Sequence, residues 1–215
     1  MKIPALVIML LLAYLLGSIP TAVWIGRIFY KTDVRLHGSG NAGATNVIRV
    51  FGWSAGIPVL LIDLAKGWAA TSLPVFMHMA PASGALIINL QILAGLTAIT
   101  GHIFPILAGF RGGKGVATIF GMLLALQPVL TLCVIGVFLA VLLITGIVSV
   151  SSMSAGTAFP ALLFLFFDSP SVIFKVFSIL VTIALIITHR KNIRRLMKGE
   201  ESRLFSLRTK KTIRR

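Results

Sequence analysis

Acidic side chains are scarce in this sequence of 215 residues. It holds five Asp and Glu against 20 Lys and Arg, and charged residues together make up 12% of the chain. A soluble domain usually carries about twice that charged fraction. No His-Glu-x-x-His pattern or ligand-spaced pair of carboxylates occurs, so the sequence predicts no metal site. No order of Ser, His and Asp indicates a hydrolytic triad either.

Cysteine occurs once, as Cys133 within an apolar run. A single cysteine forms no intrachain disulfide, and the Cys-x-x-Cys spacing of redox and zinc sites is absent. We expect Cys133 to be a buried, unreactive thiol.

Charged residues are missing altogether from long stretches of the chain. Residues 3–26, 67–110 and 115–167 contain none, with histidine counted as neutral. A membrane-spanning helix needs about 20 apolar residues, so these runs hold one, two, and two or more spans. The first run is too long for the core of a signal peptide, so we expect it to be a retained span. The predicted fold class is an all-α membrane protein, a polytopic helical bundle.

Basic residues collect in polar segments around residues 26–49, around 110–115 and in the tail from residue 189. The positive-inside rule places all three in the cytoplasm, and this accounts for the net charge of +15 without nucleic acid. An even number of spans must then separate successive segments.

Three breaks in the apolar sequence, at 127–128, 149–154 and 168–170, favour seven spans. The N-terminus is then outside and the C-terminus is cytoplasmic. Two longer spans after residue 115, five in all, are the alternative. The seven predicted spans are roughly 3–25, 54–77, 85–107, 116–126, 129–146, 153–167 and 171–188.

The end of the chain is strongly basic, since residues 189–215 hold 11 Lys and Arg and 2 Glu. We divide the chain into one integral-membrane domain, residues 1–200, and a basic cytoplasmic tail, residues 201–215. The tail is interpreted as an anchor to anionic lipid head groups.

A glycine-rich segment follows the first span, where residues 37–46 read His-Gly-Ser-Gly-Asn-Ala-Gly-Ala-Thr-Asn. Gly38, Gly40 and Gly43 match G-x-G-x-x-G, but no strand precedes them, so a dinucleotide site is rejected. Glycines let backbone N–H groups approach an anion, and a following helix N-terminus favours negative charge. The segment therefore predicts phosphate binding, with Arg49 as a forked cation. A flexible surface loop is the alternative. The neutral hydrogen-bonding residues are Ser39, Asn41, Thr45 and Asn46.

A second glycine-rich segment, residues 109–118, reads Gly-Phe-Arg-Gly-Gly-Lys-Gly-Val-Ala-Thr. Gly115 follows Lys114 where a P-loop has Ser or Thr, so nucleotide hydrolysis is not predicted. A turn of Gly112, Gly113, Lys114 and Gly115 that opens a helix still suits phosphate capture, with the lysine as a point charge. The alternative is a basic anchor of membrane topology.

Polar residues also occur inside or beside the spans. Asp63 and Lys66 are spaced i, i+3 half-way along the second span, where charges are costly and usually paired. They form either a structural ion pair or part of a polar cavity that Lys66 faces. His102 is either a buried hydrogen-bonded residue or a ligand. His189 and Asn192 share one face if the chain stays helical beyond the last span; a juxtamembrane cluster that binds anionic lipid is the alternative.

At these segments the chain resembles the bacterial acyl-phosphate–glycerol-3-phosphate acyltransferases, membrane enzymes that make lysophosphatidic acid. The similar runs follow the family's order and cover about residues 15–200, whereas the long basic tail departs from it. The runs are Leu-Leu-Gly-Ser-Ile-Pro (15–20), Gly-Ser-Gly-Asn-Ala-Gly-Ala-Thr-Asn-Val-Ile-Arg (38–49), Asp-Leu-Ala-Lys-Gly (63–67), Gly-His-Ile-Phe-Pro (101–105), Gly-Gly-Lys-Gly-Val-Ala-Thr (112–118) and His-Arg-Lys-Asn-Ile-Arg-Arg-Leu-Met-Lys-Gly-Glu (189–200). Each run alone is weak, but six in order are specific.

The resemblance implies a seven-span enzyme of the bacterial inner membrane whose site faces the cytoplasm. Its substrates would be an acyl phosphate and glycerol 3-phosphate, and it would need no cofactor or metal. The catalytic residues would be Ser39, Lys114, His189 and Asn192. The phosphate-binding residues would be Gly38, Gly40, Asn41, Gly43, Thr45, Asn46, Arg49, Gly112, Gly113, Lys114 and Gly115. Lys66 and His102 are further candidates.

The chemistry of an acyl phosphate agrees with this interpretation. The donor is already activated, so positioning and charge stabilisation suffice when the sn-1 hydroxyl attacks the acyl carbonyl. The hydroxyl proton goes either to His189 or to the donor phosphate. The His-x-x-x-x-Asp dyad of acyltransferases that use acyl-CoA is absent. A transporter of phosphorylated metabolites and a lipid-binding scaffold are the alternatives. The predicted partners are the two substrates and membrane lipids, and no nucleic acid.

Overall fold

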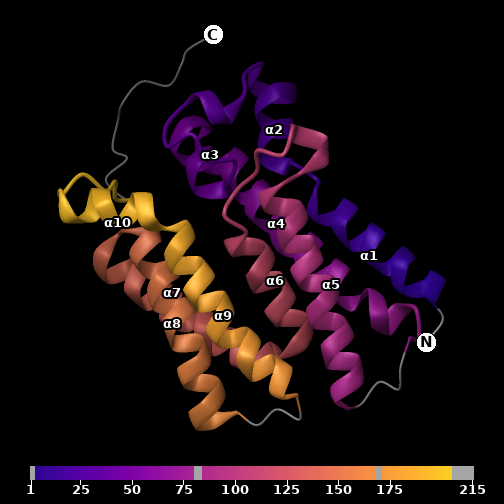
Figure 1. The fold of residues 1–215 in the computed structure, drawn as a ribbon. Helices are drawn as coiled ribbons and strands as arrows, with labels where there is room; N and C mark the ends of the chain where they lie inside the picture. The colour runs from indigo at the N-terminus through magenta and orange to yellow at the C-terminus, as the bar shows by residue number, and fades with distance from the viewer. Residues whose placement is uncertain (1–2, 80–83, 168–170, 205–215) are drawn as a thin grey trace. The chain divides into compact units, whose positions relative to one another are not determined.

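The computed structural model describes residues 3–79, 84–167 and 171–204, and in these ranges all regular structure is helical. The helices are labelled along the chain in Figure 1. The chain divides into two compact units. The first comprises Met1–Val129 and Ser169–Phe174, and the second comprises Leu130–Asp168 and Lys175–Arg215.

Helix α4 (Trp53–Phe76) lies at the centre of the first unit (Figure 1). It packs most extensively against four helices: α1 (Ile3–Gly17), α3 (Ala44–Phe51), α5 (Ala85–Ile103) and α6 (Val116–Leu126). The remaining elements of this unit are α2 (Thr21–Tyr30) and the 3-10 turns η1 (Val34–Leu36) and η2 (Ile106–Ala108). This core therefore brings both glycine-rich segments, which precede α3 and α6, to the ends of helices packed on α4.

The first predicted span is broken in two. Helix α1 ends at Gly17, α2 begins at Thr21, and the two helices are bent by 41°. Proline disfavours the helical conformation at the preceding residue and lacks an N–H, so Pro20 explains why the chain leaves the helix here. The break frees the carbonyl of Ile19 to accept a hydrogen bond from outside its own helix.

Glycine allows α4 and α6 to approach each other at backbone distance. A Cβ at Gly67 would clash with the carbonyl of Thr118, and a Cβ at Gly121 would clash with the carbonyl of Leu64. Small residues permit this kind of close packing between membrane helices. The start of α6, where the second glycine-rich segment ends, is thereby fixed against α4.

We expect Gly121→Ala to destabilise the first unit by about 2 kcal/mol or more, because overpacking against backbone cannot be relieved by a rotamer change. Thermal unfolding in detergent is the measurement. Gly136→Ala in the second unit is the matched control, because a Cβ there has no neighbour within 4 Å. Equal unfolding temperatures for the two variants would show that the close approach contributes nothing.

Four helices carry the described part of the second unit: α7 (Pro128–Thr145), α8 (Val148–Phe166), α9 (Val172–Thr188) and α10 (Arg190–Met197). Helix α8 packs on α9, where Thr182 Oγ1 donates to Gly156 O at 2.6 Å and the rings of Phe159 and Phe177 meet edge to face. Helices α9 and α10 are bent by 56°. His189 lies at this bend.

The predicted break at 149–154 is wrong, because these residues lie inside α8. The chain turns instead at Gly146, whose φ is +69°. The hydroxyls of Ser151 and Ser152 donate to the carbonyls of Ile147 and Val148, each at 2.9 Å. Serine side chains satisfied within the helix in this way do not interrupt it.

The structure supports a polytopic membrane protein. Trp53–Phe76, Ala85–Ala108, Pro128–Thr145 and Val148–Phe166 are long and apolar enough to cross a membrane, and the two bent pairs α1–α2 and α9–α10 bring the number to six. Val116–Leu126 is a shorter apolar helix. The count of seven spans and the orientation of the termini stay predictions.

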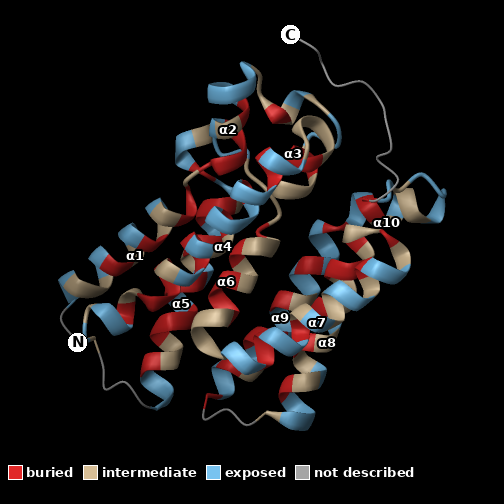
Figure 2. Cartoon of the chain, turned by 180° about the vertical axis from the view of Figure 1, so that it is seen from behind, coloured by how far each residue is buried: buried red, intermediate tan, exposed pale blue. Residues whose placement is uncertain are grey.

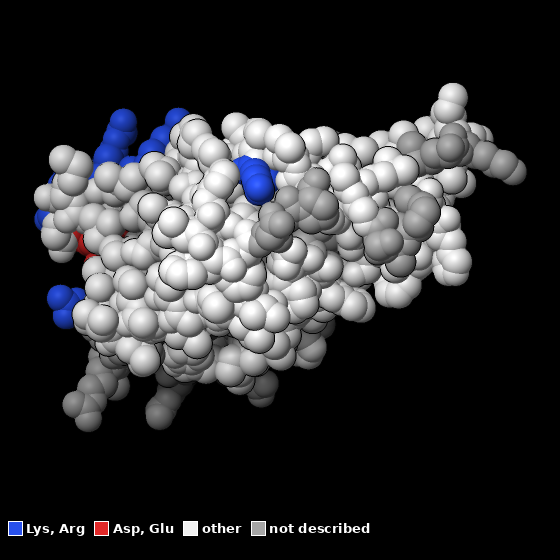
Figure 3. Space-filling view, turned by 90° about the horizontal axis from the view of Figure 1, so that it is seen from below, with Lys and Arg blue, Asp and Glu red and all other residues white. Residues whose placement is uncertain are grey.

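Apolar side chains are exposed along the membrane-length helices, as lipid contact requires. Figure 2 shows exposed residues in pale blue along α1, where Ile3 is 78% exposed and Leu11 is 58% exposed. Figure 3 shows a face on which nearly all the described side chains are uncharged. Cys133 is exposed on α7, so the prediction of a buried thiol is wrong.

Candidate phosphate-binding loops and a buried polar centre

The first glycine-rich loop is shaped by Asn46, which is 1% exposed. Its Nδ2 donates to Val34 O at 3.1 Å and to His37 O at 3.0 Å, while its Oδ1 accepts from Ser39 N at 2.8 Å. Gly38 has φ +60°, and a Cβ there would clash with this amide. Both N–H donors of Asn46 are thus used within the chain. These bonds give Asn46 a role in holding the loop.

The rest of this loop presents polar groups at the surface. Gly38, Ser39 and Gly40 are exposed, and Asn41, Gly43, Thr45 and Arg49 are half-buried. Helix α3 begins at Ala44 without a side-chain cap, so backbone N–H groups of its first turn lack intrahelical partners. Such a terminus attracts an anion. Of the predicted residues, Thr45, Asn46 and Arg49 lie on α3, and the others lie in the loop before it.

The second glycine-rich loop is held against the end of α5. Gly112 N donates to Ile103 O at 3.0 Å, and Gly113 N donates to His102 O at 3.2 Å. The N–H groups of Gly112 and Gly113 are therefore hydrogen-bonded within the protein. Gly115 has φ +76° and precedes the first residue of α6. Lys114 is half-buried beside this helix start, which leaves it and Gly115 as the phosphate-binding candidates of the loop.

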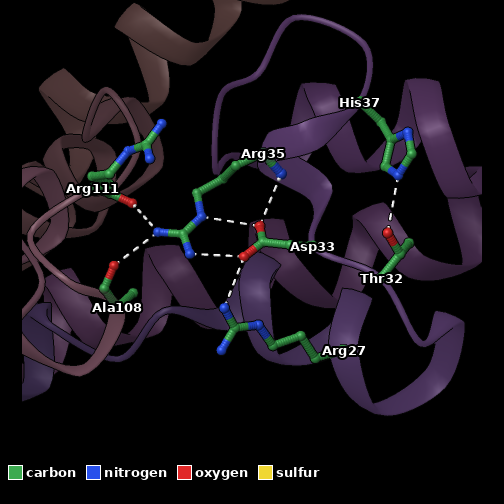
Figure 4. A network of polar contacts seen from close by, with 7 residues as sticks. All are labelled: Arg27, Thr32, Asp33, Arg35, His37, Ala108 and Arg111. Atoms are coloured by element: carbon green, nitrogen blue, oxygen red, sulfur yellow. Dashed lines mark hydrogen bonds and ion pairs between the residues drawn. The ribbon is translucent and has the colours of Figure 1, made fainter.

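Asp33 and Arg35 form an ion pair just before the first loop, and neither was predicted to be a site residue. Asp33 Oδ1 accepts from Arg35 N and Nε, each at 3.0 Å, and Oδ2 accepts from Arg35 Nη2 at 2.7 Å (Figure 4). Arg27 Nη2 also donates to Oδ2, at 3.0 Å. The hydrogen bonds from Arg35, and to a smaller extent the one from Arg27, hold the pKa of Asp33 well below its usual value, although partial burial raises it. Asp33 is therefore ionised at neutral pH.

A buried polar centre lies behind the second loop. Lys66 Nζ contacts Asp63 Oδ1 at 2.9 Å and donates to Ile19 O, at the α1–α2 break, at 2.8 Å. Thr21 Oγ1 donates to Asp63 Oδ1 at 3.2 Å. Asp63 and Lys66 are 2% and 5% exposed. Both alternatives for this pair hold in part, because it is a buried ion pair and it also lines a cavity with Gly112 and Gly113.

His102 belongs to the same centre and is 6% exposed. Its Nδ1 lies 3.1 Å from Thr118 Oγ1 and 3.8 Å from Asp63 Oδ1. The cavity beside it has a volume of about 10 Å³, enough for about one water molecule. A substrate phosphate does not fit there. His102 is thus a buried hydrogen-bonded residue that supports the second loop through its carbonyl.

We expect Lys66→Met alone to destabilise the protein by about 3 kcal/mol or more, because it leaves the Asp63 carboxylate buried and unpaired. The double variant Asp63→Asn, Lys66→Met removes both charges and should recover most of that loss. Unfolding temperature in detergent measures both effects. If the double variant were as unstable as the single one, pairing with Asp63 would not be what Lys66 provides.

His189 is 3% exposed at the bend between α9 and α10. Its Nδ1 lies 2.8 Å from Leu185 O. A carbonyl oxygen only accepts, so Nδ1 carries the proton of this bond, and Nε2 of the neutral ring is the nitrogen able to accept one. This tautomer is the one that a general base requires.

Asn192 is buried one turn further along, where its Nδ2 donates to Glu201 Oε1 at 2.5 Å. Glu201 also accepts from Ser149 Oγ at 2.9 Å and from Arg195 Nε at 2.7 Å. Burial alone raises the pKa of Glu201, but hydrogen bonds from Asn192, Arg195 and Ser149 together lower it. The carboxylate thus stays ionised at neutral pH and orients Asn192. Glu201 was expected in the basic tail, and no sequence pattern indicated this role.

The sequence and the fold both have close relatives. The family model for glycerol-3-phosphate acyltransferases matches residues 7–199. A glycerol-3-phosphate acyltransferase of Chlorobium luteolum is 41% identical over 226 residues, which cover 93% of this chain and 96% of the relative. One of Enterococcus faecalis is 44% identical over 214 residues, which cover 96% and 95%.

Two crystal structures of PlsY (YgiH), an integral membrane glycerol 3-phosphate acyltransferase, share the fold at 33% sequence identity. Its glycerol 3-phosphate form superposes with a TM-score of 0.81 and covers 95% of this chain and 99% of that one. Its lysophosphatidic acid form gives 0.79, with 92% and 94% covered. The family match includes both glycine-rich loops, the buried polar centre, His189 and Asn192. The chain therefore belongs to the glycerol-3-phosphate acyltransferase family and is a membrane-integral acyltransferase of phospholipid biosynthesis.

Proposed function

We propose that this enzyme transfers a fatty acyl group from acyl phosphate to the sn-1 hydroxyl of glycerol 3-phosphate. The products are lysophosphatidic acid and inorganic phosphate. The observation that supports this best is the pair of glycine-rich loops in one unit, each leading into a helix. Lys114 lies in the second loop, and Arg49 lies in the last turn of the helix that follows the first. Both substrates carry phosphate, and both loops suit an anion.

The proposed reaction forms one bond and breaks one. The sn-1 oxygen attacks the acyl carbonyl carbon, and the bond from that carbon to the phosphate oxygen breaks. The leaving group is stable phosphate, so positioning and electrostatic stabilisation are the main tasks of the protein. Ser39 and Asn192 orient the reacting groups. The hydroxyl proton goes to His189 Nε2 or to an oxygen of the donor phosphate.

We assign phosphate binding to residues at the loop surface or at the helix starts, and to Arg49, which lies in the last turn of α3. Asn46, Gly112 and Gly113 hold the loops, and Lys66 and His102 support the second loop from behind. The proposed phosphate-binding residues are Gly38, Gly40, Asn41, Gly43, Thr45, Arg49, Lys114 and Gly115.

An assay in detergent tests the donor and the class of activity together. Purified protein is given labelled glycerol 3-phosphate with either palmitoyl phosphate or palmitoyl-CoA, and lysophosphatidic acid is measured. We expect turnover with palmitoyl phosphate and a far lower kcat/KM with palmitoyl-CoA. Comparable values for the two donors would contradict the proposed donor. Because no membrane gradient exists in detergent, product formation also rules out a protein that only transports its ligand.

We also propose that the chain lies in the bacterial inner membrane with its active site facing the cytoplasm. Residues 1–200 then form one acyltransferase domain, and the tail from residue 201 contacts anionic lipid. Glu201 and Leu204 pack within the second unit, and residues 205–215 lie outside the described residues.

Cysteine labelling in a Cys133→Ala background checks this topology. We expect Leu36→Cys and Lys198→Cys, both at exposed positions, to react only with reagent that reaches the cytoplasm. Ala82→Cys, outside the described residues, should react from the external side. External labelling of Leu36→Cys or Lys198→Cys would overturn the shared cytoplasmic side of the basic segments.

A further inference from the structure

We propose that Arg35 is a positioning residue that sets the second glycine-rich loop, and with it Lys114, relative to the first loop. The proposal rests on the proposed function only in that both loops are taken to bind substrate phosphate. Arg35 lies between Asp33 and the first loop, and its side chain is 14% exposed. It reaches residues more than 70 positions away in the sequence.

The guanidinium of Arg35 is divided between two tasks. Nε and Nη2 donate to the Asp33 carboxylate, while Nη1 donates to Ala108 O at 2.8 Å and to Arg111 O at 2.9 Å (Figure 4). Four hydrogen bonds within the chain therefore occupy four of the five N–H donors that an arginine has. One donor is too few for the two-point grip by which arginine holds phosphate. Arg35 is thus committed to the protein.

The two carbonyls belong to the turn that leads into Gly112–Lys114. Within this turn Gly109 has φ +64° and Phe110 has φ +58°, a left-handed conformation that a phenylalanine rarely adopts. Phe110 N donates to Pro105 O at 2.9 Å. Since Arg35 bonds to the residues on both sides of Gly109 and Phe110, it holds the turn in a shape that the local sequence does not favour.

We call the hydrogen bonds from Arg35 to Ala108 O and Arg111 O the clamp, and Asp33 makes this clamp rigid. It fixes the guanidinium plane through two parallel bonds and also accepts from the Arg35 backbone N–H, so the side chain and the start of η1 are held together. Lysine cannot replace this arrangement, because one ammonium cannot supply a planar fork toward the carboxylate and two donors toward the carbonyls. The positive charge alone should therefore not restore the clamp.

Arg27 provides a matched control for Arg35. Arg27 also donates to Asp33 Oδ2, at 3.0 Å, but its side chain is 61% exposed. Arg35→Ala and Arg27→Ala remove the same charge from the same carboxylate. Only the first removes the bonds to Ala108 and Arg111. A difference between the two variants therefore reports on the clamp and not on net charge.

The test combines hydrogen exchange without substrate and steady-state kinetics. In Arg35→Ala and Arg35→Lys we expect the amides of Gly112 and Gly113 to exchange about tenfold faster or more, because the loop opens locally. We expect the KM for glycerol 3-phosphate to rise about tenfold, with a smaller change in kcat. Arg27→Ala should stay within about twofold of the parent in both measurements.

Three outcomes would overturn the proposal. Loss of activity in Arg35→Ala with unchanged loop exchange would show that Arg35 acts on substrate directly. Full recovery of exchange and KM in Arg35→Lys would show that charge is enough. Faster exchange throughout the first unit would show a general folding role. Exchange is measured without substrate, so it tests the clamp even if the proposed donor or acceptor is wrong.

Discussion

Replacing Lys114 by alanine is expected to lower kcat/KM for glycerol 3-phosphate by about 100-fold or more. Lys114 is half-buried at the start of α6, in the loop held against α5. Truncating one partner of a desolvated, charged hydrogen bond costs about 2–5 kcal/mol, and about 2.7 kcal/mol corresponds to 100-fold. Initial rates over a range of both substrate concentrations measure the loss.

Lys191→Ala is the control for this experiment. It removes the same charge from an exposed position on α10, so activity should change little. Arg49→Lys offers an intermediate case, because it keeps the charge and loses the planar fork, with an expected loss of about tenfold. If Lys114→Ala and Arg49→Ala both folded and kept the parent kcat/KM, the loops would serve membrane topology and not phosphate binding.

Replacing His189 by alanine is expected to lower kcat by about 100-fold or more while the KM values change little. A general base contributes about 10²–10⁴ to the rate, and the bond from Nδ1 to Leu185 O leaves His189 in the tautomer for this task. The KM should hold, because the phosphate-binding residues are elsewhere. Steady-state kinetics of the variant give kcat and KM separately.

The pH profile distinguishes the two proposed proton acceptors. If His189 is the base, kcat of the parent falls at low pH as the imidazole is protonated, and the variant lacks this fall. His189→Asn is the control for burial, because its amide can still donate toward Leu185 O. A parent and variant with the same pH dependence, and with kcat reduced less than about threefold, would assign the proton to the donor phosphate.

Much of the helical architecture follows from where the charges are missing. The predicted spans 54–77 and 116–126 correspond to Trp53–Phe76 and Val116–Leu126. Such segments are recognisable because lipid excludes charge and because polar breaks flank them. The interruption at Pro20 and the continuity of α8 through its serines were harder to predict from the sequence. The first depends on one proline in an apolar run, and the second depends on hydroxyl groups satisfied by their own helix.

The candidate site was predicted as a set of loops but not in its detail. The residue types and spacing indicated phosphate binding, yet the direction of each polar group depends on its neighbours in the fold. Asn46 turns to Val34 and His37, and the Gly112 and Gly113 amides turn to the end of α5. These partners are remote in sequence or fixed only by packing. Sequence patterns therefore locate the loops better than they locate the donors.

Arg35 and Glu201 are residues of structural importance that the sequence patterns did not indicate. Neither belongs to a glycine-rich segment, and Arg35 is one of 20 Lys and Arg residues in the chain. The ion pair of Arg35 could have been predicted from the sequence. In an Asp-x-Arg pair before a turn, the carboxylate can accept from both the backbone N–H and the guanidinium of the arginine. The role of Glu201 was harder to predict, because its partner Ser149 is 52 positions away in the sequence.

The shortness of α6 has a consequence for the surrounding bilayer. Its 11 residues rise about 17 Å, little more than half of a hydrocarbon core of about 30 Å. Gly67 and Gly121 fix this helix against the much longer α4, so it cannot slide to match a thick membrane. Lipid next to α6 must thin, or polar groups at one of its ends must lie below the head groups. The depth of Lys114 in the membrane is therefore set by the protein, and a change in membrane thickness has to be absorbed by the lipid.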